Sequence, residues 1–155
     1  MGETIAVNRK ARHDYVIEDT LEAGIVLRGT EIKSVREGKV NLQDAYARIE
    51  RGEAWLIGCH IAPWGTAHSR FNHEAKRQRK LLLHRVQIDQ LLGKTKAKGL
   101  TLVPLRLYLN DRGRVKVELG LARGKQAFDR RRDIAERDAR RDMEREMADV
   151  RTGRR

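Results

Sequence analysis

The apolar residues of this chain come in short alternating runs separated by turn residues, a pattern typical of β-hairpins. One predicted hairpin covers residues 45–61 and turns at Glu50-Arg51-Gly52-Glu53. A second covers residues 100–121 and turns at Asn110-Asp111-Arg112-Gly113. A polar pair followed by Gly between apolar runs favours a tight turn, so antiparallel pairing of neighbouring segments dominates what this chain can fold into.

Other segments predict a longer strand, two helices and a loop. Alternation over Tyr15–Leu27, interrupted at Ala23-Gly24, indicates a bent strand or a strand pair. Residues 30–38 and 86–99 space their apolar residues as short helices do, and each ends in Gly. The polar segment from Trp64 to Lys80 predicts a long, exposed, mobile loop.

These elements predict a mainly β fold. About six short strands with two intervening helices, in a body of roughly 125 residues, fit a small closed or partly open β-barrel better than a parallel α/β sheet. Small barrels of this kind commonly bind nucleic acid on one face.

The charge of the chain favours a polyanionic partner. Its 155 residues include 34 Lys and Arg against 22 Asp and Glu, a formal charge of +12. Residues 1–128 hold 24 basic and 14 acidic side chains, and residues 129–155 hold 10 and 8. We therefore expect a basic barrel domain over residues 1–128 and a charged tail over residues 129–155. The tail cannot bury a core and is expected to be disordered or a frayed helix when free.

Several classes of protein are disfavoured. The sequence has no apolar run long enough to span a bilayer, and Met1-Gly2-Glu3-Thr4 does not begin a secretion signal, so we expect a cytoplasmic protein with no membrane partner. A single cysteine, Cys59, cannot form an intramolecular disulfide or a multi-cysteine zinc site. We expect a monomer.

Enzyme and metal motifs fail on inspection. Gly93-Lys94-Thr95 would need a glycine where Ile88 stands, and His73-Glu74 would need a histidine where Arg77 stands. We therefore predict no catalytic residues, no metal and no cofactor. An RNA-processing enzyme and a non-specific RNA-binding barrel remain alternatives, although the aromatic content of 5% is low for a single-strand binder.

Basic residues gather with an amide, an imidazole and an aromatic ring between Asn8 and Tyr15, which is chemistry suited to RNA. Further cations follow at Arg77, Arg79 and Lys80, beside Leu81-Leu82-Leu83, and at Lys116. A barrel could bring these segments onto one side.

Five blocks of the sequence resemble the SsrA-binding protein (SmpB) family of bacteria. They are NRKARHDY from Asn8, EAGIVLRGTEIKSVREGKVNL from Glu22, RKLLLH from Arg79, GLTLVP from Gly99 and GRVKVELGLARGKQAFDRR from Gly113. The resemblance implies a closed β-barrel of the oligonucleotide-binding type. It also implies an adaptor of trans-translation that binds the tRNA-like domain of transfer-messenger RNA (tmRNA) and is not an enzyme.

The resemblance also implies partners and site residues. The partners are tmRNA, elongation factor Tu with alanylated tmRNA, and the decoding centre and messenger channel of the small ribosomal subunit. Residues that match the family's motifs, together with the basic residues near them, are the candidate RNA contacts: Asn8, Arg9, Lys10, Arg12, His13, Glu22, Arg77, Arg79, Lys80, Leu82 and Lys116.

The tail junction carries the candidate ribosome contacts, which are Gly124, Lys125, Phe128, Asp129, Arg130 and Arg131. Arg130 replaces the family's lysine and gains bidentate phosphate contact. Phe128 stands where relatives often place a ring that stacks at the decoding centre, and Phe keeps the stacking surface but removes any polar contact.

Overall fold

A computed structural model describes residues 3–65, 72–124, 137–145 and 147. The chain divides into two compact units, residues 1–123 and 124–155. The predicted boundary after residue 128 lies outside the described residues.

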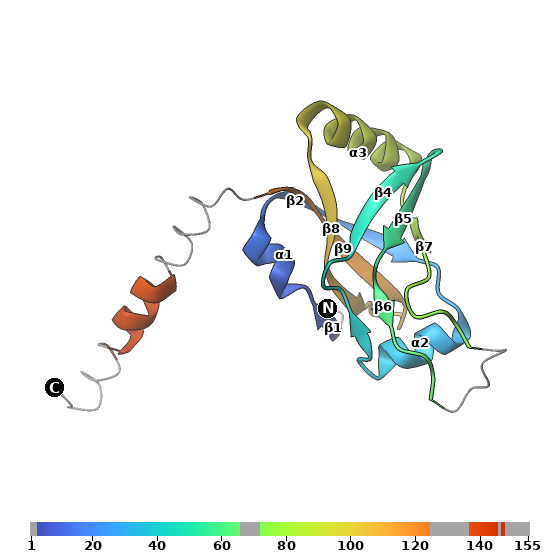
Figure 1. Cartoon of the computed structure of the whole chain (residues 1–155), viewed down its shortest axis with the longest axis horizontal. Helices are drawn as coiled ribbons and strands as arrows, with labels where there is room; N and C mark the ends of the chain where they lie inside the picture. Colours follow the sequence, from blue (N-terminus) through green and yellow to red (C-terminus); the bar gives the residue numbers. More distant parts are fainter. Residues whose placement is uncertain (1–2, 66–71, 125–136, 146, 148–155) are drawn as a thin grey trace. The chain divides into compact units, whose positions relative to one another are not determined.

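Figure 1 shows the first unit as a curved sheet with small helices at its edges. The elements in chain order are β1 (Glu3–Val7), α1 (Arg9–Asp14), β2 (Tyr15–Ile25), α2 (Gly29–Arg36), β3 (Val40–Asn41), β4 (Tyr46–Glu50), β5 (Glu53–Ile57), β6 (His60–Ile61), β7 (Arg79–Leu82), α3 (Arg85–Lys98), β8 (Thr101–Leu109) and β9 (Val115–Gly124).

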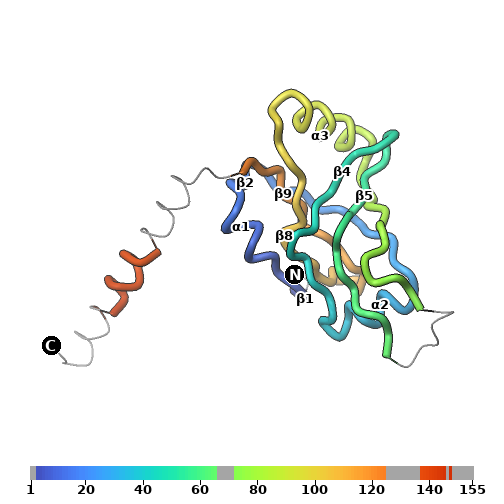
Figure 2. The backbone as a smooth tube through the Cα atoms, in the orientation of Figure 1, coloured from blue at the N-terminus to red at the C-terminus, as the bar shows by residue number. Residues whose placement is uncertain are grey.

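Six strands close into a ring, which confirms the predicted barrel. Their order is β8-β4-β5-β7-β2-β9, and β9 pairs with β8 to complete the circuit. Figure 2 traces the path of the backbone through these strands. The long strand β8 pairs with β4 at Leu102 and with β1 from Arg106 to Leu109. β1 therefore lies beside the ring, and β3 and β6 form a separate two-stranded ladder.

Local sequence signals explain the predicted elements that the structure confirms. Both hairpins form, and the first turns through Arg51 and Gly52, whose φ angles of 53° and 75° fit a type I′ turn. Helix α3 ends at Gly99, which has a φ of 63°. The segment from Tyr15 is one continuous strand to Ile25.

Two predictions about local structure were wrong, and one helix was missed. Helix α1 was not predicted, because six residues show no apolar period. The strand predicted to reach Ile61 breaks at Gly58, where a φ of 78° turns the chain away. The segment before Lys80 is not uniformly exposed, since His73 and Arg79 are buried.

A bulge in β8 separates two apolar clusters. The register with β9 shifts between Pro104 and Arg106, so Leu105 is an extra residue. Inside the ring, Leu102 and Leu107 join the main core, whereas Leu105 packs outside with Ala11 of α1. A Cβ on Gly120 would lie 3.0 Å from Leu105, so this glycine leaves room for the bulged side chain. The bulged residue Leu105 thus provides the apolar surface against which α1 packs.

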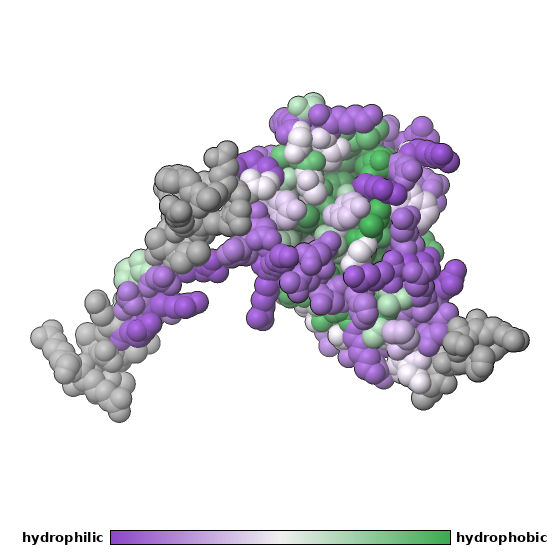
Figure 3. Space-filling view, in the orientation of Figure 1, coloured by the Kyte–Doolittle hydropathy of each residue, from purple (hydrophilic) through white to green (hydrophobic). Residues whose placement is uncertain are grey.

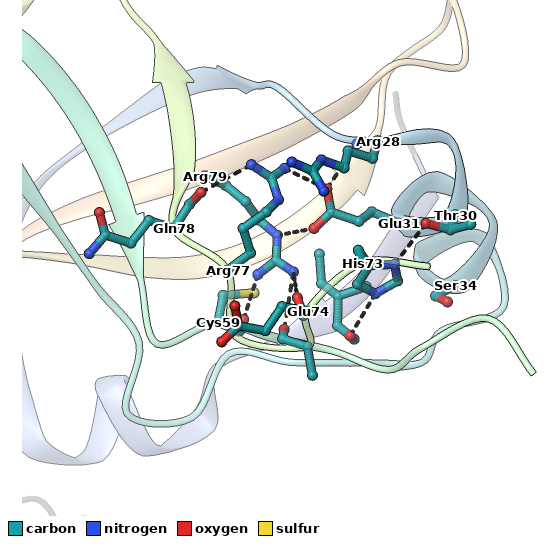
Figure 4. Close-up of polar contacts among 12 residues, drawn as sticks. Arg28, Thr30, Glu31, Ser34, Cys59, His73, Glu74, Arg77, Gln78 and Arg79 are labelled. Atoms are coloured by element: carbon teal, nitrogen blue, oxygen red, sulfur yellow. Dashed lines mark hydrogen bonds and ion pairs between the residues drawn. The ribbon is translucent and has the colours of Figure 1, made fainter. Parts of the chain in front are cut away.

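A buried ion pair joins α2 to β7 (Figure 4). Glu31 and Arg79 are both fully buried, and Nε of Arg79 donates to Oε2 of Glu31 at 2.5 Å. Arg77 donates to the other carboxylate oxygen at 2.6 Å. The remaining N–H groups of Arg79 donate to the carbonyls of Cys59, Glu74 and Ala75. The bond from Arg77 and the bonds to the Glu74 and Ala75 carbonyls fasten the segment before β7, while the bonds to Glu31 and Cys59 join β7 to α2 and to the turn before β6.

His73 extends this cluster toward α2. Its Nε2–H donates to the carbonyl of Ile61 at 2.9 Å, and its Nδ1 is hydrogen-bonded to the hydroxyl of Thr30 at 2.9 Å. The imidazole is therefore occupied at both nitrogens by the fold.

Burial opposes ionisation of Glu31, but hydrogen bonds from Arg77, the Arg28 amide and Arg79 outweigh it and hold the pKa of this carboxyl below its usual value. Because the folded pKa is lowered, the resulting stability is complete above the unfolded pKa of about 4.3 and is lost as pH falls through the folded value.

In the second unit, residues 137–145 and 147 are helical. Arg145 lies 3.9 Å from Asp142, one turn earlier. We also predict that the tail, residues 129–155, is disordered or a frayed helix when free and becomes helical on the ribosome.

We predict that Glu31→Gln lowers the free energy of unfolding by about 3–5 kcal/mol, because it leaves the Arg79 guanidinium buried without a counter-charge. The stability of the wild type should decline as pH falls below about 4.3. Glu31→Gln should lose part of this decline, because its amide does not titrate. Urea unfolding at pH 7 and across the acid range measures both effects.

The matched control is Glu50→Gln, which removes a carboxylate paired with Arg48 on the surface. It should change stability by no more than about 0.5 kcal/mol. Equal stability of the two variants at pH 7 would contradict the central role of the buried pair.

Candidate nucleic-acid interface

Helix α1 presents the basic amino-terminal motif on the outside of the barrel. Arg9, Lys10, Arg12 and His13 are all exposed. Lys10 lies 2.5 Å from Asp44, and Arg12 lies 3.6 Å from Glu118 of β9. Hydrophilic side chains cover the surface around α1 in Figure 3. The helix forms a cationic ridge with its side chains in solvent.

Asn8 anchors this ridge and is itself buried, with 4% of its surface exposed. Its Oδ1 accepts from the Ala11 amide and caps α1, and its Nδ2 donates to the carbonyls of Leu42 and Pro104. Its own amide donates to the Leu105 carbonyl. A direct RNA contact by Asn8 would require these bonds to break, so in this structure Asn8 positions α1 on the bulge of β8.

Three predicted contacts from three strands meet in one shallow hollow. Glu22 of β2, Leu82 of β7 and Lys116 of β9 line it. Lys116 Nζ lies 4.0 Å from Oε1 of Glu22, and the Leu82 side chain is 53% exposed. The remaining lining residues are Gly24, Leu83, His84 and Gln87, and we call this site the Glu22 hollow.

Gly24 shapes the apolar wall of the Glu22 hollow. It pairs with Leu82 across β2 and β7, and a Cβ at this position would lie 3.1 Å from the Leu82 Cβ. The missing side chain lets Leu82 lie over the strand. A second groove continues from the same residues past Val26 and Ile32 to Arg36 and Arg114. Leucine on the floor and cations at the rim can receive an unstacked base and its phosphate.

The predicted basic group before the triple leucine is not a single surface. Alternation along β7 turns Arg79 and Leu81 into the core, which corrects the prediction that Arg79 is exposed to RNA. Arg77 is paired with the buried Glu31, and about a quarter of the Arg77 side chain is exposed. Lys80 is partly exposed and pairs with Glu53 of β5. Of the RNA contacts predicted in this segment, Leu82 lines the Glu22 hollow and Arg77, Arg79 and Lys80 do not.

Of the predicted tail contacts, Gly124 is the exposed last residue of β9. Lys125, Phe128, Asp129, Arg130 and Arg131 lie outside the described residues.

Sequence reasoning missed Arg106 and Tyr108. The phenol O–H of Tyr108 donates to Oε2 of Glu22, and the Arg106 guanidinium lies 4.3 Å from the centre of the Tyr108 ring. The sequence did carry a signal for these two residues. Arg106 and Tyr108 occupy alternate positions of the apolar strand Leu105–Leu109, and alternation turns both side chains away from the barrel interior.

Among the described residues, no group of three or more His, Cys, Asp or Glu side chains could hold a metal ion. In the same part of the chain, no helix is long and apolar enough to cross a membrane.

Comparison with known proteins gives a consistent set of matches. The family described as SmpB protein matches residues 5–149. An SsrA-binding protein of Symbiobacterium thermophilum is 59% identical over 145 residues, covering 94% of this chain and 91% of the relative. An SsrA-binding protein of Roseiflexus sp. is 60% identical, covering 92% and 90%.

A solved structure described as "tmRNA-SmpB: a journey to the center of the bacterial ribosome" superposes with a TM-score of 0.66 at 54% identity. The match covers 79% of this chain and 85% of the solved one. Sequence and fold therefore agree on the same relatives.

We predict that Asn8→Ala lowers the free energy of unfolding by about 2 kcal/mol, because it removes a helix cap and leaves two main-chain carbonyls without their donor. Hydrogen exchange at the Ala11 amide should also accelerate. The control, Asn41→Ala, removes an exposed local bond to the Gln43 amide and should cost less. Unchanged exchange at Ala11 would contradict the anchoring role of Asn8.

Proposed function

This chain belongs to the SmpB family, and we propose that it is the RNA-binding adaptor of trans-translation, which binds the tRNA-like domain of tmRNA and delivers it to stalled ribosomes. The family match extends over residues 5–149, so it includes both the barrel and much of the tail. The relatives are SsrA-binding proteins, and the matching solved structure places SmpB with tmRNA in the ribosome.

The observation that carries the proposal is the convergence of Glu22, Leu82 and Lys116 in one hollow. Each side chain offers a different contact to RNA. Lys116 can neutralise a phosphate, Leu82 can cover an unstacked base, and Glu22 can accept from a base amine or a 2′-hydroxyl.

Helix α1 supplies the second part of the RNA surface. Its four basic residues lie on the same exposed helix and can contact successive phosphates. Such contacts carry little sequence information, so they add affinity while the Glu22 hollow selects the RNA.

The tail has a separate task in this proposal. Lys125, Phe128, Asp129, Arg130 and Arg131 would engage the empty decoding site, and the following helix would enter the messenger channel. Arginine-rich segments can grip ribosomal RNA and gain order as they bind. The chain would act in the cytoplasm, with elongation factor Tu carrying the alanylated tmRNA, and it would perform no catalytic step of its own.

We predict that binding to tmRNA weakens steeply with salt and exceeds binding to ordinary tRNA or single-stranded RNA. Lys116→Ala should weaken affinity about tenfold and lower the slope of log affinity against log salt by about 0.7–0.9, because one phosphate contact is lost. Leu82→Ala should weaken affinity with the slope unchanged. Gel-shift titrations at several salt concentrations measure these quantities.

The matched control is Lys39→Ala, which removes an exposed cation that pairs with Glu37. It should leave both affinity and slope as in the wild type. A preference of the wild type for single-stranded RNA would overturn the adaptor function and favour a non-specific RNA-binding barrel.

We predict that truncation before Asp129 leaves tmRNA affinity nearly intact but abolishes peptide tagging on stalled ribosomes. The removed segment has 10 basic and 8 acidic residues, so the charge available to tmRNA barely changes. Gel shift and a tagging assay on the same protein separate the two tasks. As a control, a tail of equal composition in shuffled order should fail in tagging, and full activity of that variant would reduce the tail to a charged appendage.

A further inference from the structure

Tyr108 spans the strand that carries Lys116. In the ring, β9 lies between β2 and β8, and Tyr108 of β8 is paired in register with Lys116 of β9. Its phenol nevertheless reaches Glu22 on β2 and donates to Oε2. Only 8% of Tyr108 is exposed. This residue therefore links all three strands at the edge of the Glu22 hollow.

The phenol remains a donor under physiological conditions. Burial, with the hydrogen bond to Glu22 in support, raises the pKa of Tyr108 to about 12, although Arg106 acts in the opposite direction. A neutral phenol facing an ionised carboxylate makes a strong, charge-assisted hydrogen bond.

The Tyr108 ring is held from its other side. The Arg106 guanidinium lies 4.3 Å from the ring centre, while its Nε donates to Glu118 at 2.7 Å and its Nη1 donates to Thr4 at 3.1 Å. Glu118 also pairs with Arg12 of α1. A continuous series of contacts therefore runs from α1 through Arg106 and Tyr108 to Glu22.

This arrangement decides where the Glu22 carboxylate lies. The side chain is 56% exposed, so solvent alone would allow it several rotamers. With Oε2 held by Tyr108, Oε1 is directed to the side of Lys116 but stays 4.0 Å from its Nζ, beyond hydrogen-bond distance. Lys116 thus keeps donors for phosphate, and Oε1 keeps a lone pair for RNA.

We propose that Tyr108 is a positioning residue of the RNA site, which holds Glu22 so that one carboxylate oxygen stays free to accept from an RNA base amine or 2′-hydroxyl beside Lys116. The inference rests on the proposed function, because it concerns how the Glu22 hollow recognises RNA. Tyr108 does not itself touch the RNA in this proposal.

The test is a double-mutant cycle on tmRNA affinity with Tyr108→Phe, Glu22→Ala and the double variant. Tyr108→Phe keeps the ring under Arg106 and removes the hydroxyl only. We expect a loss of about fivefold or more for each single variant, and no further loss when Tyr108→Phe is added to Glu22→Ala, because Tyr108 acts through Glu22. A purely structural tyrosine would weaken binding equally in both backgrounds.

Two further variants complete the experiment. Tyr46→Phe removes a hydroxyl from a half-exposed ring on β4 and should leave affinity unchanged. Glu22→Asp keeps the charge and leaves Tyr108 intact but shortens the reach by one methylene, so it should lose affinity as Glu22→Ala does. This variant tests the contact even if Tyr108→Phe folds poorly.

The outcomes separate the two proposals. Failure of the wild type to bind tmRNA would overturn the proposed function itself. If the wild type binds tmRNA, three results would overturn the positioning role of Tyr108 alone. These are full affinity of Tyr108→Phe, full affinity of Glu22→Asp, and additive losses in the double-mutant cycle.

Discussion

The ion pair between Glu31 and Arg79 is the constraint on which the rest of the barrel depends. It joins residues 48 positions apart, and both charges are fully buried. A buried ion pair is tolerated only when the other polar atoms of both side chains are hydrogen-bonded. Here the carbonyls of Cys59, Glu74 and Ala75 accept from the remaining N–H groups of the Arg79 guanidinium. Arg79 is the first residue of β7, so its burial beside Glu31 sets which residues of that strand face outward. Leu82 therefore lies at the surface.

A second attachment, between α1 and the bulge of β8, arranges the other half of the proposed RNA surface. The extra residue Leu105 provides an apolar seat, and the carbonyls of Pro104 and Leu105 accept from Asn8. The helix has only six residues and could not persist in water alone. Its basic side chains are therefore presented by tertiary contacts that attach the cationic ridge to β8.

In the proposed function, the barrel supplies affinity for RNA and the tail senses the empty messenger channel. Residues 1–128 hold 24 basic and 14 acidic side chains, so long-range attraction to RNA comes from the barrel. Charge alone would bind any polyanion. Selectivity then requires a few directed groups, and the contacts among Arg106, Tyr108 and Glu22 supply them at a site where Lys116 provides charge.

The sequence by itself determined the hairpins, the helices α2 and α3 and the barrel class, because turn glycines and alternation act between near neighbours. Motif resemblance also located Glu22, Leu82 and Lys116. Only the tertiary structure decided that these three meet, that Asn8 and Arg79 are buried, and that Tyr108 holds a carboxylate 86 positions away. A polar residue of a given type lies in the core or on the surface depending on the partners that distant segments of the chain bring to it. No local sequence pattern encodes those partners.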